Sequence, residues 1–569
     1  VSVIFIPSNK SLMKKNVVHL FLTLITAGMF LQSCKAPHEL DATPKKPGKY
    51  PDFSERIKLL GTMTKYRSCF DVNYYNIDVK IDPANKTVGG TVKMVSTAVS
   101  DFDTLQIDLY PNMNLKTVTS DLGEVKFMRK EGAIFITMPH AVTVGKKFEL
   151  TVTYDGSPII AKKPPWDGGM DWSKDDLGNP WIGVACETEG ASLWWPCKDH
   201  NSDEADSVDI SVTVPDGLMA VCNGQLRDSS EVNGWKKFHW HVSYYINNYD
   251  VTFYIGKFKL MHDTYTGING KTLDLNHYVL PQNWDKAKTQ FEQVKDVLKF
   301  YETTFGEYPW YRDGFKLVNS PYEGMEHQTA IAYGSNFKNF SGLDFDYIIV
   351  HETAHEWWGN AITAQDFSDV WLQEGFATYS EALYVESKYN IGMYYNYLQF
   401  YRMQNMNARP MVGPVGVRYF DYHDEDVYTK GTGTLETLRA TINNDSVFFG
   451  ILKTYFAHYR YHQITSEEFI SVVNEKTGQD YHWFFNQYLH NRLIPTLEYS
   501  WDSDGKFAYR WKNCNSDFKM SIVLDCGTST QTMYPTTTLQ HDKLFPGIKY
   551  TQFSVDSNHK LYKFDYLEK

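Results

Sequence analysis

Two histidines in the middle of the chain, separated by three residues, could bind one metal ion. Residues 351–355 read HETAH, and the apolar run before them with Gly359 behind them predicts a helix. Positions i and i+4 of a helix face the same side, so His351 and His355 can both reach one Zn²⁺. Glu352 then lies at the flank of the metal, in the position of a general base for a water molecule. The spacing therefore predicts a metal-assisted hydrolytic site.

A third metal ligand is predicted in the next helical segment. Residues 371–377 read WLQEGFA, and Glu374 lies 19 residues after His355. A loop and a second helix fit in that interval and can turn the carboxylate of Glu374 back to the metal. Two histidines and one glutamate leave a fourth position open, which is the arrangement of a catalytic zinc site. Asp369 is a candidate hydrogen-bond partner for one of the ligand imidazoles.

The elements that must position these residues fall into three regions. The chain has 569 residues, which suggests about three or four domains. Short alternating runs such as 75–82, 90–95 and 208–214 predict an all-β domain over 53–260. From Asp285 apolar residues recur at helical spacing, with a strand-like stretch near 315–333, and we predict a mostly α catalytic domain over 261–494. The alternating pattern returns over 495–569.

Charge and composition exclude several classes of protein. The chain carries 56 basic and 68 acidic residues, a net charge of -12, which argues against a nucleic-acid binder. Hydrophobic residues make up 42%, too many for a disordered chain. Seven cysteines without a CxxC pair argue against a disulfide scaffold and a cysteine zinc site. Cys514 and Cys526 could pair, or both could be reduced and buried.

The first 52 residues resemble a processing signal and a tether. Residues 13–15 (MKK) are typical of a basic start, and residues 17–29 form a mostly apolar run too short to span a membrane. Residues 31–34 (LQSC) are similar to a bacterial lipobox, so 1–34 are predicted to be upstream residues and a lipoprotein signal. Residues 35–52 are rich in Pro and Lys and predict a tether. An ordinary secretory signal or an anchor helix is the alternative.

From about residue 70 onward the chain resembles one family of zinc enzymes. HETAH followed by WLQEGFA is similar to the zinc aminopeptidases of the aminopeptidase N and leukotriene epoxide hydrolase family. Residues 195–199 (WPCKD) and 491–495 (NRLIP) are similar to further segments of that family. The resemblance implies a multidomain α+β protein: an N-terminal antiparallel β-saddle, a thermolysin-like helical domain with one zinc ion, and a small C-terminal β-sandwich.

The resemblance also implies substrate-binding residues. Residues 323–327 read EGMEH where the family has GxMEN, so Gly324, Met325, Glu326 and His327 are expected to contact the substrate. Glu326 should bind the free α-ammonium, since a carboxylate in a dry cleft strongly prefers a cationic partner. His327 replaces the family's asparagine, and we expect it to contact Glu326 or the substrate backbone.

Two further segments carry expected site residues. Residues 186–189 (CETE) lie where the family carries a second amine-binding segment. By that match Glu189 approaches the ammonium and Glu187 lies nearby in the first subsite. Residues 427–431 (VYTKG) resemble the family's VYxKG segment, so Tyr428 should donate a hydrogen bond to the oxyanion of the tetrahedral intermediate.

The sequence thus predicts a zinc-dependent aminopeptidase that acts on peptides with a free N-terminus. The alternatives are a thermolysin-like metalloendopeptidase, a family member with altered N-terminal specificity, epoxide hydrolysis as a side activity, and an inactive binding protein. The predicted location is the bacterial cell envelope, at the outer membrane, through a lipid on Cys34. Oligomeric state has no signal in the sequence.

Overall fold

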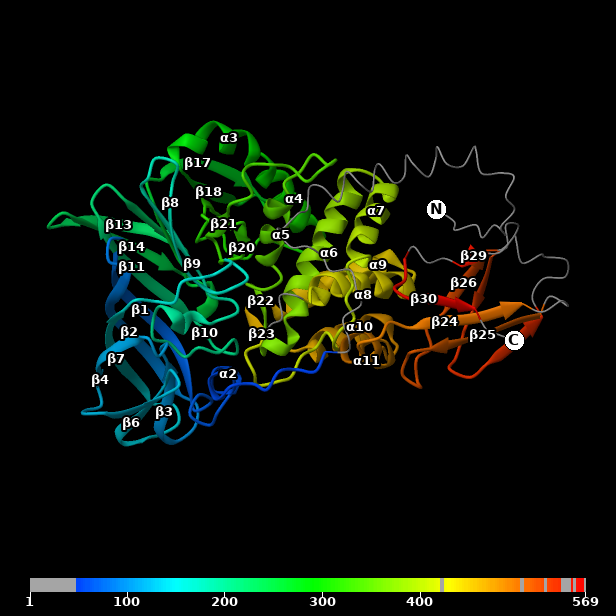
Figure 1. The fold of residues 1–569 in the computed structure, drawn as a ribbon, viewed down its shortest axis with the longest axis horizontal. Helices are drawn as coiled ribbons and strands as arrows, with labels where there is room; N and C mark the ends of the chain where they lie inside the picture. Colours follow the sequence, from blue (N-terminus) through cyan, green and yellow to red (C-terminus); the bar gives the residue numbers. More distant parts are fainter. Residues whose placement is uncertain are drawn as a thin grey trace.

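Three regions follow one another along the long axis of the molecule (Figure 1). The computed structural model describes residues 48–419, 424–501, 506–525, 530–543, 554–555 and 559–566. A β-rich region lies at the left, helices fill the middle, and a second β-rich region lies at the right. The predicted multidomain α+β fold is therefore confirmed. The predicted signal, Cys34, most of the tether, and Cys526 lie outside the described residues.

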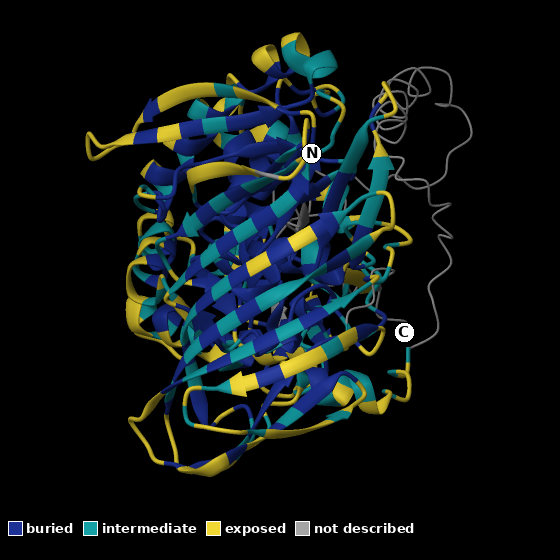
Figure 2. Cartoon of the chain, turned by 90° about the vertical axis from the view of Figure 1, so that its left-hand side faces the viewer, coloured by how far each residue is buried: buried dark blue, intermediate teal, exposed yellow. Residues whose placement is uncertain are grey.

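A seven-stranded sheet dominates the N-terminal region. Its order is β13-β14-β11-β1-β2-β7-β4, with bounds β1 Phe70–Asp82, β2 Thr87–Ala98, β4 Met113–Ser120, β7 Lys147–Gly156, β11 Ser207–Pro215, β13 Gln225–Val232 and β14 Trp235–Val242. Buried residues alternate with more exposed ones along β11, which leaves one face apolar (Figure 2). The predicted strands 75–82, 90–95 and 208–214 lie within β1, β2 and β11.

One strand pair departs from the predicted antiparallel arrangement. β1 pairs with β2 antiparallel, but on its other side it pairs with β11 in parallel, from Tyr74 opposite Ser207 to Lys80 opposite Thr213. The residues between β1 and β11 form other strands, and the chain then enters the sheet again in the same direction as β1. The central pair of this sheet is therefore parallel.

Smaller sheets complete the N-terminal region. Four strands are ordered β12-β16-β9-β8, and three are ordered β3-β6-β5. Their bounds are β3 Phe102–Asp108, β5 Lys126–Lys130, β6 Ala133–Val142, β8 Gly169–Lys174, β9 Pro180–Ala185, β12 Met219–Cys222 and β16 Phe253–Gly256. Strand β9 leads directly into the loop that carries Glu187 and Glu189.

A five-stranded sheet connects the N-terminal region to the helices. Its order is β17-β18-β19-β21-β20, with bounds β17 Lys259–Thr266, β18 Thr272–Val279, β19 Leu317–Asn319, β20 Gly324–Met325 and β21 Ile331–Tyr333. The strand-like stretch expected near 315–333 thus supplies three strands. Strand β20 lies at the edge of the sheet, against α5, and carries part of the EGMEH segment.

Helices form the middle region and much of the largest core. Their bounds are α3 Trp284–Gln290, α4 Gln293–Thr304, α5 Tyr347–His355, α6 Trp371–Lys388, α7 Ile391–Arg402, α8 Asp426–Ile442, α9 Asp445–Tyr459, α10 Ser466–Thr477 and α11 His482–His490. A short helix, α2 Glu55–Gly61, precedes β1. The helical pattern predicted from Asp285 is divided between α3 and α4. No helix in the described ranges is long and apolar enough to cross a membrane.

The C-terminal region is built from two small sheets. One is ordered β28-β25-β24-β30 and the other β27-β26-β29, with bounds β24 Thr496–Trp501, β25 Lys506–Lys512, β26 Ile522–Asp525, β27 Thr530–Met533, β28 Gln540–Lys543, β29 Ser554–Val555 and β30 Lys563–Tyr566. Leu497 and Trp511 belong to the same buried cluster as the helices. This region therefore shares its core with the helical region.

Candidate metal and peptide-binding site

Helix α5 presents the two histidines of the HETAH motif to one side. The Asp346 side chain caps the helix by accepting a hydrogen bond from the Ile348 amide. The helix ends at His355, earlier than the predicted stop at Gly359, which has a positive φ of +128°. The two Nε2 atoms of His351 and His355 lie 3.1 Å apart. The helix thus aims both imidazoles at one point, as the spacing predicted.

Helix α6 brings three residues with carboxylate or hydroxyl oxygens to the cavity beside the histidines. Glu374, Thr378 and Glu381 occupy positions i, i+4 and i+7, which share one face of a helix, and all three line the cavity beside the histidines. Helix α8 packs very closely against α6: a Cβ added to Gly431 would lie 2.8 Å from the Cα of Gly375. This pair of glycines lets α8 bring its first turn to the site.

The three predicted ligand atoms fit a tetrahedral metal ion. The Glu374 Oε2 atom lies 3.4 Å from His351 Nε2 and 3.3 Å from His355 Nε2. Atoms bound tetrahedrally at the zinc–nitrogen distance lie about 3.3 Å from one another. Buried Glu374 Oε2 has no hydrogen-bond partner among the described residues, which a cation would explain.

The outer nitrogens of both imidazoles are held by acceptors. His351 Nδ1 lies 2.6 Å from Glu381 Oε1, and His355 Nδ1 lies 2.8 Å from the Trp358 carbonyl oxygen. Each Nδ1 must therefore carry the proton, and each Nε2 presents a lone pair to the metal position. Three acceptor atoms converge there, so these ligands fit one divalent cation.

Glu381, and not Asp369, supports a ligand imidazole. Asp369 instead accepts a hydrogen bond from the Ser466 hydroxyl at 2.5 Å. Ser466 is the first residue of α10, and Asp369 does not line the cavity that contains the histidines. Glu381 was not predicted, although its spacing of seven from Glu374 placed it on the same helix face. Its second oxygen accepts hydrogen bonds from the Tyr397 and Tyr401 hydroxyls.

Replacing this carboxylate should weaken metal binding. We expect Glu381→Gln to lower zinc affinity by about 10–100-fold, because the ligand imidazole loses the charged acceptor that orients it and increases its basicity. Competition with a chromophoric chelator measures this affinity. The control is Glu124→Gln, which changes an exposed acid of the N-terminal region and should leave affinity unchanged. Equal affinities in both variants would contradict the role given to Glu381.

Glu352 lies between the metal position and the edge strand β20. A Cβ added to Gly324 would lie 2.3 Å from Glu352 Oε1, so a side chain at this position would displace the carboxylate from its place beside the strand. Glu352 also lines the cavity. Burial raises the pKa of Glu352 to about 8. Its place beside the metal position is that of a proton acceptor.

Two carboxylates face each other at one end of the cavity. Oxygen atoms of Glu187, Glu326 and Glu374 all lie within 4.8 Å of one another. Burial raises the pKa of Glu187 well above its usual range, and the charge of Glu326 adds to this effect. Burial also raises the pKa of Glu326. Two such acids cannot both be ionised at low cost unless a cation joins them.

Glu326 is held in place through its side chain and its backbone. The Tyr249 hydroxyl donates to Glu326 Oε1 at 3.4 Å, and the Asn360 side chain donates to the Glu326 carbonyl at 2.8 Å. Only 3% of Glu326 is exposed. These contacts orient the carboxylate before any ligand arrives. Tyr249 itself comes from the N-terminal region, so both regions build this end of the cavity.

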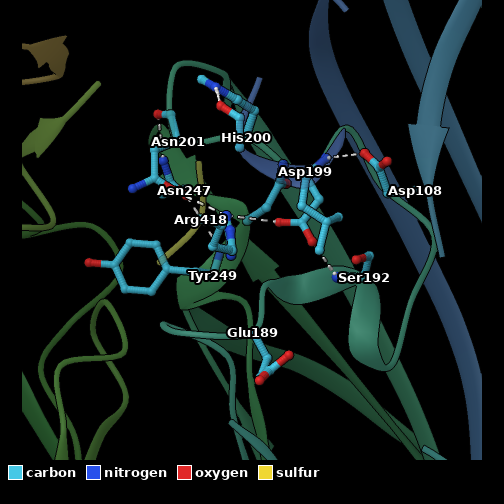
Figure 3. Close-up of polar contacts among 12 residues, drawn as sticks. Asp108, Glu189, Ser192, Asp199, His200, Asn201, Asn247, Tyr249 and Arg418 are labelled. Atoms are coloured by element: carbon cyan, nitrogen blue, oxygen red, sulfur yellow. Dashed lines mark hydrogen bonds and ion pairs between the residues drawn. The ribbon is translucent and has the colours of Figure 1, made fainter. Parts of the chain in front are cut away.

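The structure places Glu189 elsewhere. Its carboxylate accepts a hydrogen bond from the Tyr110 hydroxyl, and its carbon atoms pack against Gly168. In Figure 3 its side chain points away from Tyr249, and Glu189 does not line the cavity. The segment is a turn rather than a strand, so its side-chain directions do not alternate regularly. Glu187, expected only in a neighbouring subsite, is the acid beside Glu326.

His327 is buried behind the edge strand and does not line the cavity. Its Nδ1 atom lies 2.7 Å from the Tyr254 hydroxyl, and no hydrogen bond joins it to Glu326. Burial lowers the pKa of His327 to about 3. The imidazole therefore stays neutral at ordinary pH. The expected contact with Glu326 or the substrate is replaced by a contact with Tyr254.

Substituting His327 should change stability more than the pH profile. Because the imidazole is neutral from pH 5 to 9, we expect His327→Asn to keep the shape of the pH–rate profile. The native imidazole resists protonation, while the imidazole of the unfolded chain accepts a proton near pH 6.5. The free energy of unfolding of the wild type therefore falls by about 1.4 kcal/mol per pH unit below about pH 6. The variant has no such imidazole, so its stability does not fall for this reason. The difference between the thermal midpoints of the variant and the wild type should therefore shift in favour of the variant from pH 7.5 to pH 5. A difference that is the same at both pH values would contradict this account.

Tyr428 lies in the first turn of α8 and lines the cavity. Its ring stacks near that of His351, with centroids 6.2 Å apart. Burial raises the pKa of Tyr428 well above its usual range, and the Glu374 charge adds to this effect. The phenol therefore stays protonated and can donate a hydrogen bond. The structure thus brings Tyr428 to the predicted metal ligands.

The cavity that joins these residues has a volume of about 210 Å³. Gly324 and Met325 line it with Glu326, while Pro165 and Trp166 belong to its wall from the N-terminal region. The cavity thus follows the edge strand from the paired carboxylates, at Glu326, to Gly324 beside Glu352. Extended peptide backbone is suited to such an edge.

Arg418 connects the N-terminal region to the loop that precedes α8. Its guanidinium lies 3.2 Å from Asp199 Oδ1 and also bonds the side chain of Asn201 (Figure 3). The Asp199 carboxylate in turn accepts a hydrogen bond from the Ser192 amide. All of these groups are buried. The contact fixes Arg418, a few residues before α8, against the N-terminal region.

Two family models match successive parts of the chain. The model described as the peptidase M1 N-terminal domain matches residues 71–249. The model described as the peptidase family M1 domain matches residues 289–488, which include every predicted metal ligand. The two matches follow the order of the N-terminal and helical regions.

Curated relatives are similar over part of their length. Endoplasmic reticulum aminopeptidase 1 of Rattus norvegicus is 26% identical over 304 residues, which are 50% of this chain and 32% of the relative. Leucyl aminopeptidase of Saccharolobus solfataricus is 22% identical over 52% of this chain and 40% of its own length. Aminopeptidase N of Lactobacillus helveticus is 22% identical over 78% of this chain and 53% of its own length. The chain therefore matches about a third to a half of these relatives.

Solved structures share the fold. An M1 zinc metallopeptidase from Deinococcus radiodurans, solved with the substrate Tyr-Ser-Ala, superposes with a TM-score of 0.63 at 20% identity. The match covers 75% of this chain and 95% of that one. A structure of a two-domain M1 zinc metallopeptidase bound to L-tryptophan matches over the same shares.

Proposed function

The chain belongs to the M1 family of peptidases, and from this premise we propose that it is a zinc-dependent aminopeptidase that removes the first residue of peptides. The observation that carries the proposal is the pair of carboxylates, Glu187 and Glu326, within 4.8 Å of a metal-ligand oxygen. A free α-ammonium is the cation that a peptide can offer them. Its position so close to the metal would leave room for one residue before the scissile bond.

The residues of the chain can be given roles in hydrolysis. A zinc ion held by His351, His355 and Glu374 would supply Lewis acidity to the scissile carbonyl and to water. Glu352 accepts the proton of the attacking water and delivers it to the leaving amine. Tyr428 donates a hydrogen bond to the carbonyl oxygen as that oxygen gains charge.

Binding and orientation depend on the other end of the cavity. Glu326 and Glu187 hold the ammonium, and Tyr249 and Asn360 set the geometry of Glu326 in advance. The substrate backbone lies along β20, where Gly324 allows it to come close to Glu352. Binding the ammonium at one end and the peptide backbone along the strand places the scissile carbonyl next to Glu352.

A metalloendopeptidase fits this cavity less well. It would have to place an uncharged internal peptide segment against two buried carboxylates. Leaving these acids without a cation costs binding free energy. The paired carboxylates therefore favour the aminopeptidase over the endopeptidase alternative.

A peptide library read by mass spectrometry tests the proposed activity. Zinc-loaded protein should remove single residues from the N-terminus in succession, and a chelator should stop the reaction. Products cut at internal bonds would support an endopeptidase instead. No cleavage by the zinc-loaded protein would contradict a peptidase of either kind.

We propose also that a lipid on Cys34 holds the protein at the bacterial cell envelope, at the outer membrane. The support is the lipobox-like LQSC segment and the Pro- and Lys-rich stretch that follows it. Cys34→Ser is then expected to move the protein from the membrane fraction of cells to the soluble fraction. Retention of the variant in the membrane fraction would contradict the lipid anchor.

A further inference from the structure

The cavity carries many acids and neither lysine nor arginine. None of its lining residues is Lys or Arg, while its acids are Glu187, Glu323, Glu326, Glu352, Glu374, Glu381 and Glu425. Five of these have roles with the metal, the water or the ammonium. Glu323 and Glu425 remain without one. A cavity with this excess of negative charge attracts cationic groups and disfavours anionic ones.

Glu323 is the better placed of the two. Its backbone carbonyl accepts a hydrogen bond from the Gly334 amide at 2.8 Å, which ties the start of β20 into the sheet. The Tyr347 hydroxyl donates to Glu323 Oε1 at 2.6 Å. The side chain is half-buried, and no described Lys, Arg or His forms an ion pair with it. Glu323 is therefore a positioned carboxylate that lacks a cation among the described residues.

The order of residues along the edge strand gives Glu323 a place relative to the scissile bond. Glu326 binds the ammonium in the proposed function, Gly324 adjoins Glu352, and Glu323 lies one residue farther from the ammonium end. Three residues of fully extended chain span at most about 10 Å, so Glu323 lies no farther than that from Glu326 along the backbone. In an extended peptide, the first nitrogen and the second Cα are about 5 Å apart. A long second side chain can bridge the remaining distance.

We propose that Glu323 selects peptides whose second residue, the one after the scissile bond, is Lys or Arg. This inference rests on the proposed aminopeptidase function and names part of its substrate class. The ammonium or guanidinium of that residue would pair with the free oxygen of Glu323, while Tyr347 holds the other oxygen. An acidic second residue would be disfavoured by the same charge.

Competition between matched peptides tests this preference. Leu-Lys-Ala-Ala and Leu-norleucine-Ala-Ala differ only in the terminal ammonium group of the second side chain, and mass spectrometry gives the ratio of their kcat/KM values. We expect a ratio of about five in the wild type, as for a half-exposed ion pair, and about one in Glu323→Gln. Glu323→Lys should favour an acidic second residue. Glu124→Gln, the exposed control, should keep the wild-type ratio.

Several results would overturn the assignment. A wild-type ratio near one, or a ratio that survives Glu323→Gln, would leave Glu323 with a structural role through Tyr347 only. Loss of the preference in Glu425→Gln but not in Glu323→Gln would give the role to Glu425. Binding of the same peptides to Glu352→Gln, measured by calorimetry, should show the same charge preference. If no peptide is cleaved, the aminopeptidase proposal fails, and this binding ratio still decides whether Glu323 recognises the cation.

Discussion

Glu352→Gln is expected to lower kcat by about 10³-fold while the protein keeps its zinc. The amide has nearly the shape of the carboxylate but cannot accept the proton of the attacking water. The metal ligands are other residues, so their donor atoms stay within 3.1–3.4 Å of one another. Steady-state kinetics on a free-amine peptide and elemental analysis of the same sample measure the two quantities.

Glu356→Gln is a matched control for this substitution. Glu356 is next to His355 and as fully buried as Glu352, but it accepts hydrogen bonds from the Thr329 amide and Asn360 and does not line the cavity. Its variant should keep turnover within a few-fold of the wild type. Turnover by Glu352→Gln at a rate close to that of this control would remove Glu352 from the reaction. Loss of zinc from Glu352→Gln would show that the residue supports the metal instead.

Acetylation of a peptide's N-terminus is expected to lower kcat/KM by about 10⁴-fold. The acetyl group removes the positive charge, and it leaves Glu326 and Glu187 buried against a neutral amide. Sites built to pair with one polar group reject analogues without that group by factors of this size. The measurement compares one peptide in its free and acetylated forms at equal concentration.

A variant of Glu326 tells whether the discrimination comes from the paired carboxylates. In Glu326→Gln, we expect the free-amine peptide to lose most of its advantage, while the acetylated peptide changes little. Equal rates on both peptides with the wild-type protein would contradict the exopeptidase assignment and favour an endopeptidase. A wild-type preference that Glu326→Gln leaves intact would give the ammonium contact to Glu187 alone.

Much of the fold was predictable because each region has its own period of apolar residues. Alternation along residues 208–214 predicted the strand that became β11, and helical spacing after Asp285 predicted α3 and α4. The direction in which β11 pairs with β1 was not predictable, because alternation is the same in parallel and antiparallel pairs. The break between α3 and α4 was also missed, because the apolar spacing continues across it.

The site was predictable where a regular element determines the side-chain direction. His351 and His355 lie on one helix, so their spacing predicted that they converge, while Glu374 was predicted from the WLQEGFA segment that contains it. Glu187 and Glu189 lie in a turn, where spacing carries no such information, and the structure places the former and not the latter beside Glu326. The partner of His351 depends on how α6 packs on α5, which tertiary contacts decide.

The parallel pairing of β1 with β11 has a consequence for how the chain folds during synthesis. β1 is complete at residue 82, yet its neighbour on one side begins only at residue 207. During synthesis, one edge of β1 therefore has no partner strand until β11 emerges from the ribosome. Contacts between segments so distant in sequence form slowly, and an open edge can pair with other chains. Slowing translation after residue 215 should therefore raise the yield of folded protein more than slowing it before residue 207.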